Sequence, residues 1–191
     1  LEEASSRPIF TAEQFSEEQR AFYKAASDFV NEQVVPQHKE IELKKEGLMR
    51  DLLVQAGEIG FHMIDIPERF GGLELDKTTS CLVSEASAQH GSFSVAIGAH
   101  NGIGMLPLVF YGSEELKTEW LPKFSTAEVI GAYALTETGS GSDALGAKST
   151  AVLSEDGKEW IINGSKMWIT NAGIADVFTI FAKIDGKKFS A

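Results

Sequence analysis

The spacing of hydrophobic residues changes once along this chain, near Val129, and this change constrains the fold more than any other feature. Before it, hydrophobic residues recur every three to four positions, which is the period of an amphipathic helix. After it, short runs rich in β-branched and aromatic residues alternate with glycine-containing turns, which is typical of strands. We therefore expect an α+β protein, with an N-terminal all-α helical bundle over residues 1–128 and an antiparallel β domain over residues 129–191.

The first part of the chain is predicted to form five helices. Ser16 and Gln19 fit a capping box at the start of the first helix. Pro36 is expected to end that helix, because proline cannot continue the hydrogen-bond ladder. The other four helices are expected at 46–59, 76–89, 92–111 and 113–124.

The 92–111 segment is hydrophobic on nearly all sides, which is typical of a helix buried inside a bundle. Polar residues, glycines and a proline interrupt it, so no run of membrane-spanning length is expected. Glycine destabilises a helix, so we expect close packing or a ligand wall to require Gly98, Gly102 and Gly104.

The second part is predicted to form a β meander. Its strands are expected at 129–135, 149–153, 159–162, 166–170 and 177–183. Asp-Gly at 156–157 and Asn-Gly at 163–164 predict hairpins, because both pairs favour the positive φ angles of a type I′ turn. The chain ends after another turn and the beginning of a strand, so we expect the β domain to be incomplete at the C-terminus, with an unpaired edge.

Composition excludes several classes of protein. The chain has 191 residues, 43% hydrophobic and 24% charged, which is typical of a globular protein. The net charge of −11 argues against a nucleic-acid partner. Cys81 is the only cysteine, so no intrachain disulfide can form, and we expect Cys81 to be a small buried residue of a helix. No metal site is expected, because no metal-ligand spacing relates the histidines, His38, His62, His90 and His100.

Two segments of the β part have residues suited to a large flat cofactor with a phosphate tail. The glycines of the 139–143 loop let backbone N–H groups approach a phosphate, although the loop matches neither the Walker nor the Rossmann pattern. On the expected 166–170 strand, Trp168 and Thr170 share a face and offer a wall and a hydroxyl to an isoalloxazine ring. The alternative for Trp168 is a half-buried aromatic of an amphipathic hairpin.

Two carboxylates lie close to this loop, and we interpret both as structural rather than as an acid/base pair. Glu137 is expected to cap the backbone or to pair with a nearby cation. Asp143 is expected to accept hydrogen bonds from N–H groups of the loop.

These segments resemble the acyl-CoA dehydrogenase family. The strongest matches are Tyr-x-Leu-Thr-Glu-x-x-x-Gly-Ser-Asp at 133–143 and Ile-Asn-Gly-x-Lys-x-Trp-Ile-Thr-Asn at 162–171. The 66–72 loop resembles the family's Pro-Glu-x-x-Gly-Gly loop, and 111–122 resembles its Gly-[Ser/Thr]-x-x-x-Lys…Leu-Pro helix. One departure is Thr138, where the family often has proline, and it leaves the loop less rigid.

The resemblance covers the chain from about residue 15 to residue 191. The segments 91–94 and 175–178 are most similar to the very-long-chain branch and its bacterial relatives.

The resemblance implies that FAD lies between the β domain and a C-terminal helical domain, with help from a second subunit of a homo-oligomer. It implies that the flavin and its diphosphate contact Tyr133, Ala134, Leu135, Thr136, Glu137, Thr138, Gly139, Ser140, Gly141 and Ser142. It implies contact of the ring with Trp168, Ile169 and Thr170, and of the acyl-CoA with Ser142. The resemblance implies that the catalytic base is a glutamate of a C-terminal domain, which is expected to lie outside these 191 residues, so no catalytic residue is assigned.

The implied activity is α,β-dehydrogenation of a fatty acyl-CoA in fatty acid β-oxidation, with hydride passing to FAD and onward to an electron-transferring flavoprotein or similar acceptor. An acyl-CoA oxidase of the same fold and a non-catalytic domain fragment are the alternatives. Because the base and one wall of the cofactor site are missing, we expect the 191-residue chain to be inactive and to retain FAD poorly. The implied location is the cytoplasm of a bacterium, or the mitochondrial matrix in a eukaryote.

Overall fold

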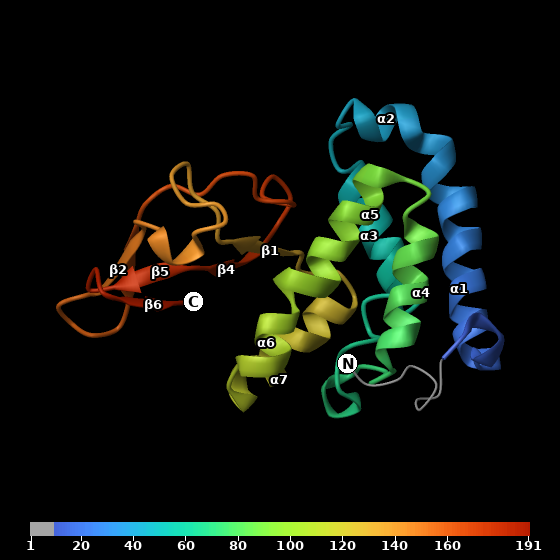
Figure 1. Cartoon of the computed structure of the whole chain (residues 1–191), viewed down its shortest axis with the longest axis horizontal. Coiled ribbons are helices and arrows are strands. Elements are labelled where there is room, and N and C mark those ends of the chain that lie inside the picture. The colour runs from blue at the N-terminus through green and yellow to red at the C-terminus, as the bar shows by residue number, and fades with distance from the viewer. Residues whose placement is uncertain (1–9) are drawn as a thin grey trace, which may run out of the picture.

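Helices occupy the first two thirds of the computed structural model, which describes residues 10–191, and strands occupy the last third (Figure 1). The helices are α1 Glu17–Phe29, α2 His38–Glu42, α3 Leu48–Glu58, α4 Lys77–Ser87, α5 Gly91–Gly98, α6 Leu106–Tyr111 and α7 Glu114–Ser125. The strands are β1 Gly131–Ala134, β2 Thr150–Leu153, β3 Trp160–Asn163, β4 Val177–Ile180, β5 Ala182–Ile184 and β6 Lys188–Ser190. The predicted α+β class is confirmed.

The first helix begins as predicted but does not end as predicted. The Ser16 hydroxyl accepts a hydrogen bond from the Gln19 N–H, and the Gln19 side chain accepts one from the Ser16 N–H, which is a complete capping box. Pro36 does not end the helical path, which continues through a π-helical turn at Val30–Val34 and a 3-10 turn at Val35–Gln37 into α2. Proline is tolerated here because it lies in the first turn of a new segment, where its missing N–H needs no partner.

The core of the helical part is organised around three aromatic rings. Phe29 of α1 lies 6.1 Å from Phe61 and 5.9 Å from Phe93 of α5, measured between ring centroids. All three side chains are at most 9% exposed. They therefore join α1 and α5 to the segment that follows α3.

In contrast to the prediction, Cys81 on α4 is exposed.

The predicted 92–111 helix is divided into α5, a π-helical segment at Ala99–Gly104, and α6. His100 in the π segment is fully buried, donates from Nε2 to the Phe124 carbonyl at 3.0 Å, and accepts from the Gly131 N–H at 3.1 Å. These two bonds require a neutral ring, and burial lowers the pKa of His100 to about 3. The π segment thus fastens the first strand to the helices.

Close packing explains one of the three glycines of this helix. A Cβ atom on Gly104 would lie 2.8 Å from the carbonyl carbon of Gly131, so β1 can approach only a glycine here. At Gly98 and Gly102 an added Cβ would meet nothing within 4 Å, so packing does not require these two glycines.

By length and composition Gly91–Tyr111 is apolar enough to cross a membrane, in contrast to the prediction, although core helices meet the same criterion.

The strands form two sheets with mixed pairing rather than one antiparallel meander. The sheets are β1-β4, which is parallel, and β3-β2-β5-β6, in which β2 and β5 are parallel. The predicted 177–183 strand is divided, because β4 joins the first sheet and β5 the second. The Asp-Gly turn at 156–157 connects β2 to β3 as predicted, but only Gly157 has a positive φ, +70°.

Arg50 joins α3 to the segment before β4. Its guanidinium donates to the carbonyls of Ile174, at 3.0 Å, and Glu128, at 2.9 Å. It also lies 2.9 Å from the Asp176 carboxylate, which accepts from the Ile130 N–H at 2.8 Å. Burial would raise the pKa of Asp176, but the bonds from Arg50 and Ile130 outweigh it and lower the pKa. Arg50 therefore fixes the β part to the helices.

Replacing Arg50 with alanine is expected to lower the free energy of unfolding by about 1–2 kcal/mol, because three acceptors lose a charged donor at a half-exposed site. Arg50→Lys should recover only part of the loss, since an ammonium lacks the planar fork. Urea unfolding measures both. The control is Arg69→Ala, because Arg69 forms an exposed pair with Glu114 and its loss should change stability by less than about 0.5 kcal/mol. Equal effects at Arg50 and Arg69 would contradict this role for Arg50.

Candidate functional site

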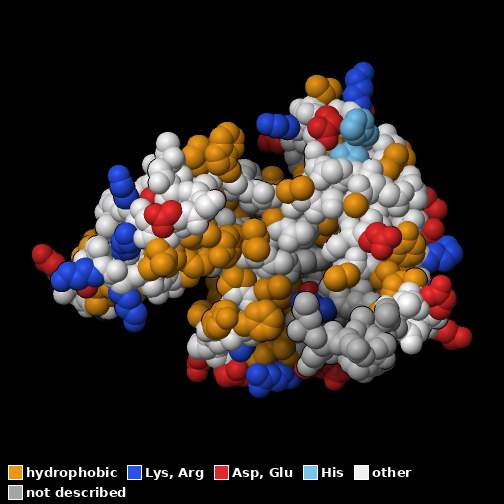
Figure 2. All heavy atoms as spheres, in the orientation of Figure 1, with side chains coloured by type: hydrophobic (Ala, Val, Ile, Leu, Met, Phe, Trp, Pro, Cys, Tyr) orange, Lys and Arg blue, Asp and Glu red, His pale blue; other side chains and the backbone are white. Residues whose placement is uncertain are grey.

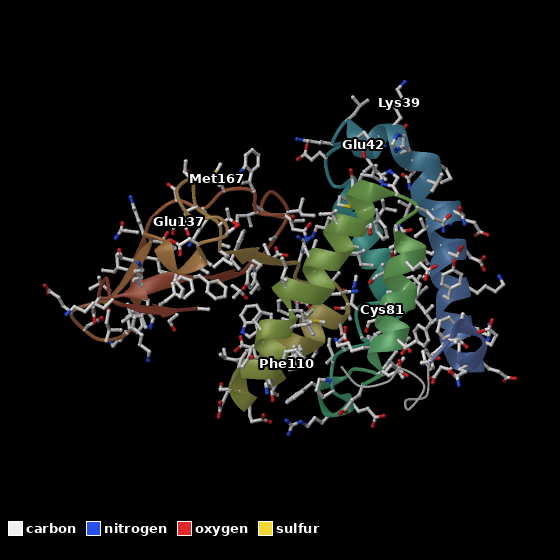
Figure 3. The ribbon with its side chains drawn as sticks, in the orientation of Figure 1. Lys39, Glu42, Cys81, Phe110, Glu137 and Met167 are labelled. Atoms are coloured by element: carbon white, nitrogen blue, oxygen red, sulfur yellow. The ribbon has the colours of Figure 1, made fainter. Side chains whose placement is uncertain are left out.

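The structure brings the two predicted cofactor segments together (Figure 3). The Met167 N–H donates to the Thr136 carbonyl at 2.9 Å, and the Lys166 ammonium donates to the Leu135 carbonyl at 3.0 Å. Figure 3 labels Glu137 and Met167 on these neighbouring segments. The site can therefore be described as one unit made of the chain after β1 and the chain before β4.

Glu137 has the structural role that was predicted, and it lies at the centre of this unit. Its buried carboxylate accepts from the Lys166 ammonium at 2.9 Å and from the N–H groups of Lys148, at 2.6 Å, and Ser149, at 3.0 Å. Burial would raise the pKa of Glu137, but these hydrogen bonds outweigh it and lower the pKa to about 2. The carboxylate therefore stays charged and fastens three segments to one another. The sequence predicted a cation partner but could not identify Lys166, which is 29 residues away.

The 138–142 loop begins with a tight turn closed by Glu137. Glu137 and Ser140 exchange two backbone hydrogen bonds, of 3.0 and 3.1 Å. The Ser140 hydroxyl is buried and donates to the Asp143 carbonyl at 2.6 Å. The same carbonyl accepts from the Gly146 N–H at 3.0 Å, so the acceptor role predicted for Asp143 is taken by its backbone. Gly139, Gly141 and Ser142 remain exposed on the outside of this anchored loop.

Neither the backbone conformation nor packing explains the two glycines of the loop. Neither Gly139 nor Gly141 has a positive φ. A Cβ atom added at either position would meet nothing within 4 Å. The space beside both backbones is therefore open to a ligand, and any side chain there would extend into it.

The predicted strand at 166–170 does not form, and Trp168 and Thr170 do not share a strand face. Trp168 has a φ of +58° and Asn171 of +68°, which no strand contains. The segment instead makes a compact turn, in which the Asn171 carbonyl accepts from the Ile174 N–H at 2.8 Å. The hairpin predicted at 163–164 is absent for the same reason. Because β4 pairs with β1 in parallel, the chain after β3 must cross to the other sheet rather than fold back on β3.

Trp168 is held in an unfavourable conformation and is not covered by protein. Its side chain is 83% exposed, although the left-handed region is rare for a bulky residue. Such strain is most often found at functional sites, where the surrounding structure imposes it. Asn171 anchors the same turn, because its amide donates to the Ala96 carbonyl of α5 at 2.9 Å and to the Gly131 carbonyl at 3.3 Å. Sequence reasoning missed this role of Asn171.

A cavity of about 830 Å³ lies beside this turn. Its walls come from the loop between α2 and α3, the exposed side of α5, and residues 169–174. Most of the lining surface is apolar, with Met49, Val95 and Ile174 among the hydrophobic residues, while Thr170 supplies a hydroxyl and Glu42, Lys44, Lys45 and Glu46 supply charges. Such a cavity suits an apolar ligand with a polar end. Gly98 and Gly102 do not line this cavity; they line a separate cavity of about 120 Å³ between α5 and α4.

The other residues predicted to contact the cofactor lie either on β1 or in segments outside the strands. Tyr133 and Ala134 belong to β1, where Ala134 is buried and the Tyr133 ring lies 4.9 Å from that of Phe181. Ala134 can therefore reach a ligand only through its backbone. Leu135, Thr136 and Ile169 are half-buried, and Thr138 is exposed.

Two family models match the chain, and together they cover most of it. Residues 16–128 match the model described as "Acyl-CoA dehydrogenase, N-terminal domain", and residues 132–190 match "Acyl-CoA dehydrogenase, middle domain".

Individual proteins give the same result. A protein of Bacillus subtilis described as a probable acyl-CoA dehydrogenase is 48% identical over 191 residues, all of this chain and 32% of that protein. The very long-chain specific acyl-CoA dehydrogenase of rat mitochondria is 39% identical over 139 residues, 72% of this chain and 21% of its own. The crystal structure of an acyl-CoA dehydrogenase complexed with FAD from Bacillus anthracis superimposes with a TM-score of 0.94 at 48% identity, over 96% of this chain and 31% of that one. The chain thus spans about a third or less of the length of these relatives.

Proposed function

The chain belongs to the acyl-CoA dehydrogenase family, and from this premise we propose that it forms the N-terminal part of an FAD-dependent enzyme that dehydrogenates fatty acyl-CoA between its α and β carbons in fatty acid β-oxidation. One observation carries the proposal. Gly139 and Gly141 leave open space that neither their φ angles nor any protein contact explains, in the loop that the family motif assigns to the cofactor. A diphosphate beside the backbone would account for both glycines.

The residues present fit FAD at this site. We propose that the loop from Gly139 to Ser142 holds the diphosphate, because exposed backbone N–H groups and hydroxyls are the donors a phosphate needs. Trp168, whose ring is uncovered, would lie against the isoalloxazine, with Ile169 and Thr170 completing the contact. FAD, when bound, supplies the acceptor for the hydride that leaves the β carbon. The backbone of Tyr133, Ala134, Leu135, Thr136, Glu137 and Thr138 would line the same edge.

The substrate is proposed to enter beside Ser142 and to place its acyl chain along α5. The hydrophobic cavity between α5 and residues 169–174 supports this path, because its apolar lining suits an alkyl chain. Gly98 and Gly102 open toward the separate cavity beside α4, so the ligand wall expected at these glycines stays a prediction.

We assign no catalytic base within residues 10–191. A general base works best with a pKa near the operating pH. Glu137 does not meet this condition, because its pKa is about 2 and its carboxylate is already bonded to Lys166 and two N–H groups. We propose that the proton is removed by a carboxylate outside these residues.

We further propose a helical domain over residues 1–128 and a β domain over residues 129–191, in a homo-oligomer that passes electrons to an electron-transferring flavoprotein or a similar acceptor. Relatives are bacterial and mitochondrial, which supports the cytoplasm of a bacterium or the mitochondrial matrix as the location.

The glycine loop provides the test of this proposal. Gly141→Val, made in a protein of the family's full length, is expected to weaken FAD binding by about 100-fold or more, because a branched side chain would occupy the space of the diphosphate. Gly141→Ala should have a smaller effect in the same direction. Titration of the flavin-free protein with FAD, followed by flavin fluorescence, measures the affinity for FAD. Bleaching of the flavin band by a saturated acyl-CoA measures the reaction.

The matched control is the stability of the same variants without FAD. Nothing lies within 4 Å of the added Cβ, so the free energy of unfolding should change by less than about 0.5 kcal/mol. Unchanged FAD affinity in Gly141→Val would show that the loop is only a connector. Loss of stability without FAD would show that the glycine serves the fold.

A further inference from the structure

Two histidines and a glutamate meet at the end of the helical part that carries α2. His38 and Glu42 lie one turn apart on α2, and His90 is the residue before α5. One nitrogen of each histidine and one carboxylate oxygen of Glu42 all lie within 4.8 Å of one another. We propose that these three side chains form a binding site for a divalent transition-metal ion, with Zn²⁺ as the reference ion.

The distances are close to those of a bound ion. His38 Nδ1 and His90 Nε2 are 3.0 Å apart. In a tetrahedral site with Zn–N bonds of 2.0–2.1 Å, two ligand nitrogens are separated by about 3.3–3.4 Å. The two rings therefore need to separate by only a few tenths of an ångström. Glu42 is exposed, so its side chain can rotate toward the ion without disturbing the core.

Neighbouring groups orient two of the three ligands. The Ser92 hydroxyl donates to Glu42 at 2.6 Å, which is the kind of contact that holds a metal-binding carboxylate in place. His90 is 4% exposed, and its Nδ1 caps α5 by accepting from the Phe93 N–H at 3.3 Å. Because the His90 ring is buried, packing keeps Nε2 directed toward His38 whether or not the bond with Phe93 is present. Figure 2 shows histidine side chains at the surface of this end of the molecule, beside acidic ones.

The proton positions predict a site of moderate affinity. Because Nδ1 of His90 accepts from the Phe93 N–H, Nε2 carries the proton, and this proton is donated to His38 Nδ1. The ion must take the place of that proton, which moves to Nδ1 of His90 and ends the bond with Phe93. That bond is long, at 3.3 Å, so its loss should limit the affinity to the micromolar range and not prevent binding.

The ligand set also predicts which ions bind. Two imidazoles and one carboxylate suit Zn²⁺, Co²⁺, Ni²⁺ and Cu²⁺, whereas Mg²⁺ and Ca²⁺ prefer sites built of oxygen. His38 and Glu42 are open to solvent, so water can fill the fourth position. An ion at this position would join α2 to the start of α5, next to the hydrophobic cavity that Glu42 and Ser92 also line.

The experiment is a calorimetric titration of the metal-free 191-residue chain with ZnCl₂, repeated with CoCl₂ while the visible absorption of tetrahedral Co²⁺ is recorded. We expect one site in the micromolar range that excess Mg²⁺ does not block. Each of His38→Ala, Glu42→Gln and His90→Asn should weaken Zn²⁺ binding at least tenfold. Asparagine is chosen at His90 because it can still cap α5.

The matched control is Glu40→Gln, since Glu40 is an exposed carboxylate of the same helix outside the cluster, and it should leave Zn²⁺ affinity unchanged. Circular dichroism of each variant checks that the helices are retained. Absence of saturable binding, or equal binding by the ligand variants and the control, would overturn the proposal.

Discussion

Replacing Glu137 with alanine is expected to lower the free energy of unfolding by about 3–5 kcal/mol. The reason is that the change removes the charged partner of Lys166 and the acceptor of two backbone N–H groups, while Lys166 keeps only its bond to the Leu135 carbonyl. Lys166 would lose its carboxylate partner at a site where only 12% of its side chain is exposed, and the N–H groups of Lys148 and Ser149 would lose their partners. Urea unfolding followed by circular dichroism measures the loss. Glu155→Ala is the control, because Glu155 is exposed in the β2–β3 turn and should contribute less than about 0.5 kcal/mol.

The pH dependence of this difference follows from the pKa of Glu137. Its folded pKa of about 2 lies below the ordinary value of 4.5, so the folded state binds fewer protons than the unfolded state between these values. The contribution of Glu137 is therefore complete above pH 4.5 and is lost as the pH falls toward 2. The stabilities of wild type and Glu137→Ala should converge over this range. A constant difference would show that the carboxylate charge contributes nothing.

Gly104→Ala is expected to lower the free energy of unfolding by about 1–3 kcal/mol. Its Cβ would lie 2.8 Å from both the Ala99 carbonyl oxygen and the Gly131 carbonyl carbon, and these are backbone atoms that cannot rotate away. Either the π segment or β1 must shift, which also lengthens the bond from the Gly131 N–H to His100.

Gly102→Ala is the matched control, two residues away in the same π segment. Its Cβ would meet nothing within 4 Å, and alanine favours a helix over glycine by roughly 0.5–1 kcal/mol, so this variant should be as stable as wild type or more stable. Thermal unfolding of both variants makes the comparison. A stable Gly104→Ala variant would mean that β1 is not packed against the helix as described.

Local signals in the sequence predicted the parts of the fold that depend on a few neighbouring residues. The capping box of Ser16 and Gln19 and the position of the Asp156-Gly157 turn are such signals, and both are confirmed, although Asp156 lacks the positive φ of a type I′ turn. Pro36 was misinterpreted because a π turn before it changes the hydrogen-bond ladder, and nothing in the local pattern indicates that turn.

The sequence predicted that the two motif segments lie together, but it did not predict their geometry. The two motifs do lie together, but Trp168 and Thr170 were expected on a strand because the 166–170 pattern alternates as a strand does. The parallel pairing of β4 with β1 decides otherwise, and it is a long-range property. Lys166 and Asn171 acquire their roles from partners far away in sequence, Glu137 and Ala96, which no short window contains.

The parallel pairing of β1 with β4 also orders events during synthesis of the chain on the ribosome. β1 follows directly after α7, yet its partner Val177 lies 46 residues beyond Gly131. The helices can assemble as they emerge, and His100 can already hold the Gly131 N–H. The 139–142 loop lies in sequence between the two paired strands, so the sheet beside it is complete only after β4 has left the exit tunnel. Because such long-range pairing forms slowly, we expect the parallel pair of β1 and β4 to form after the helices have packed.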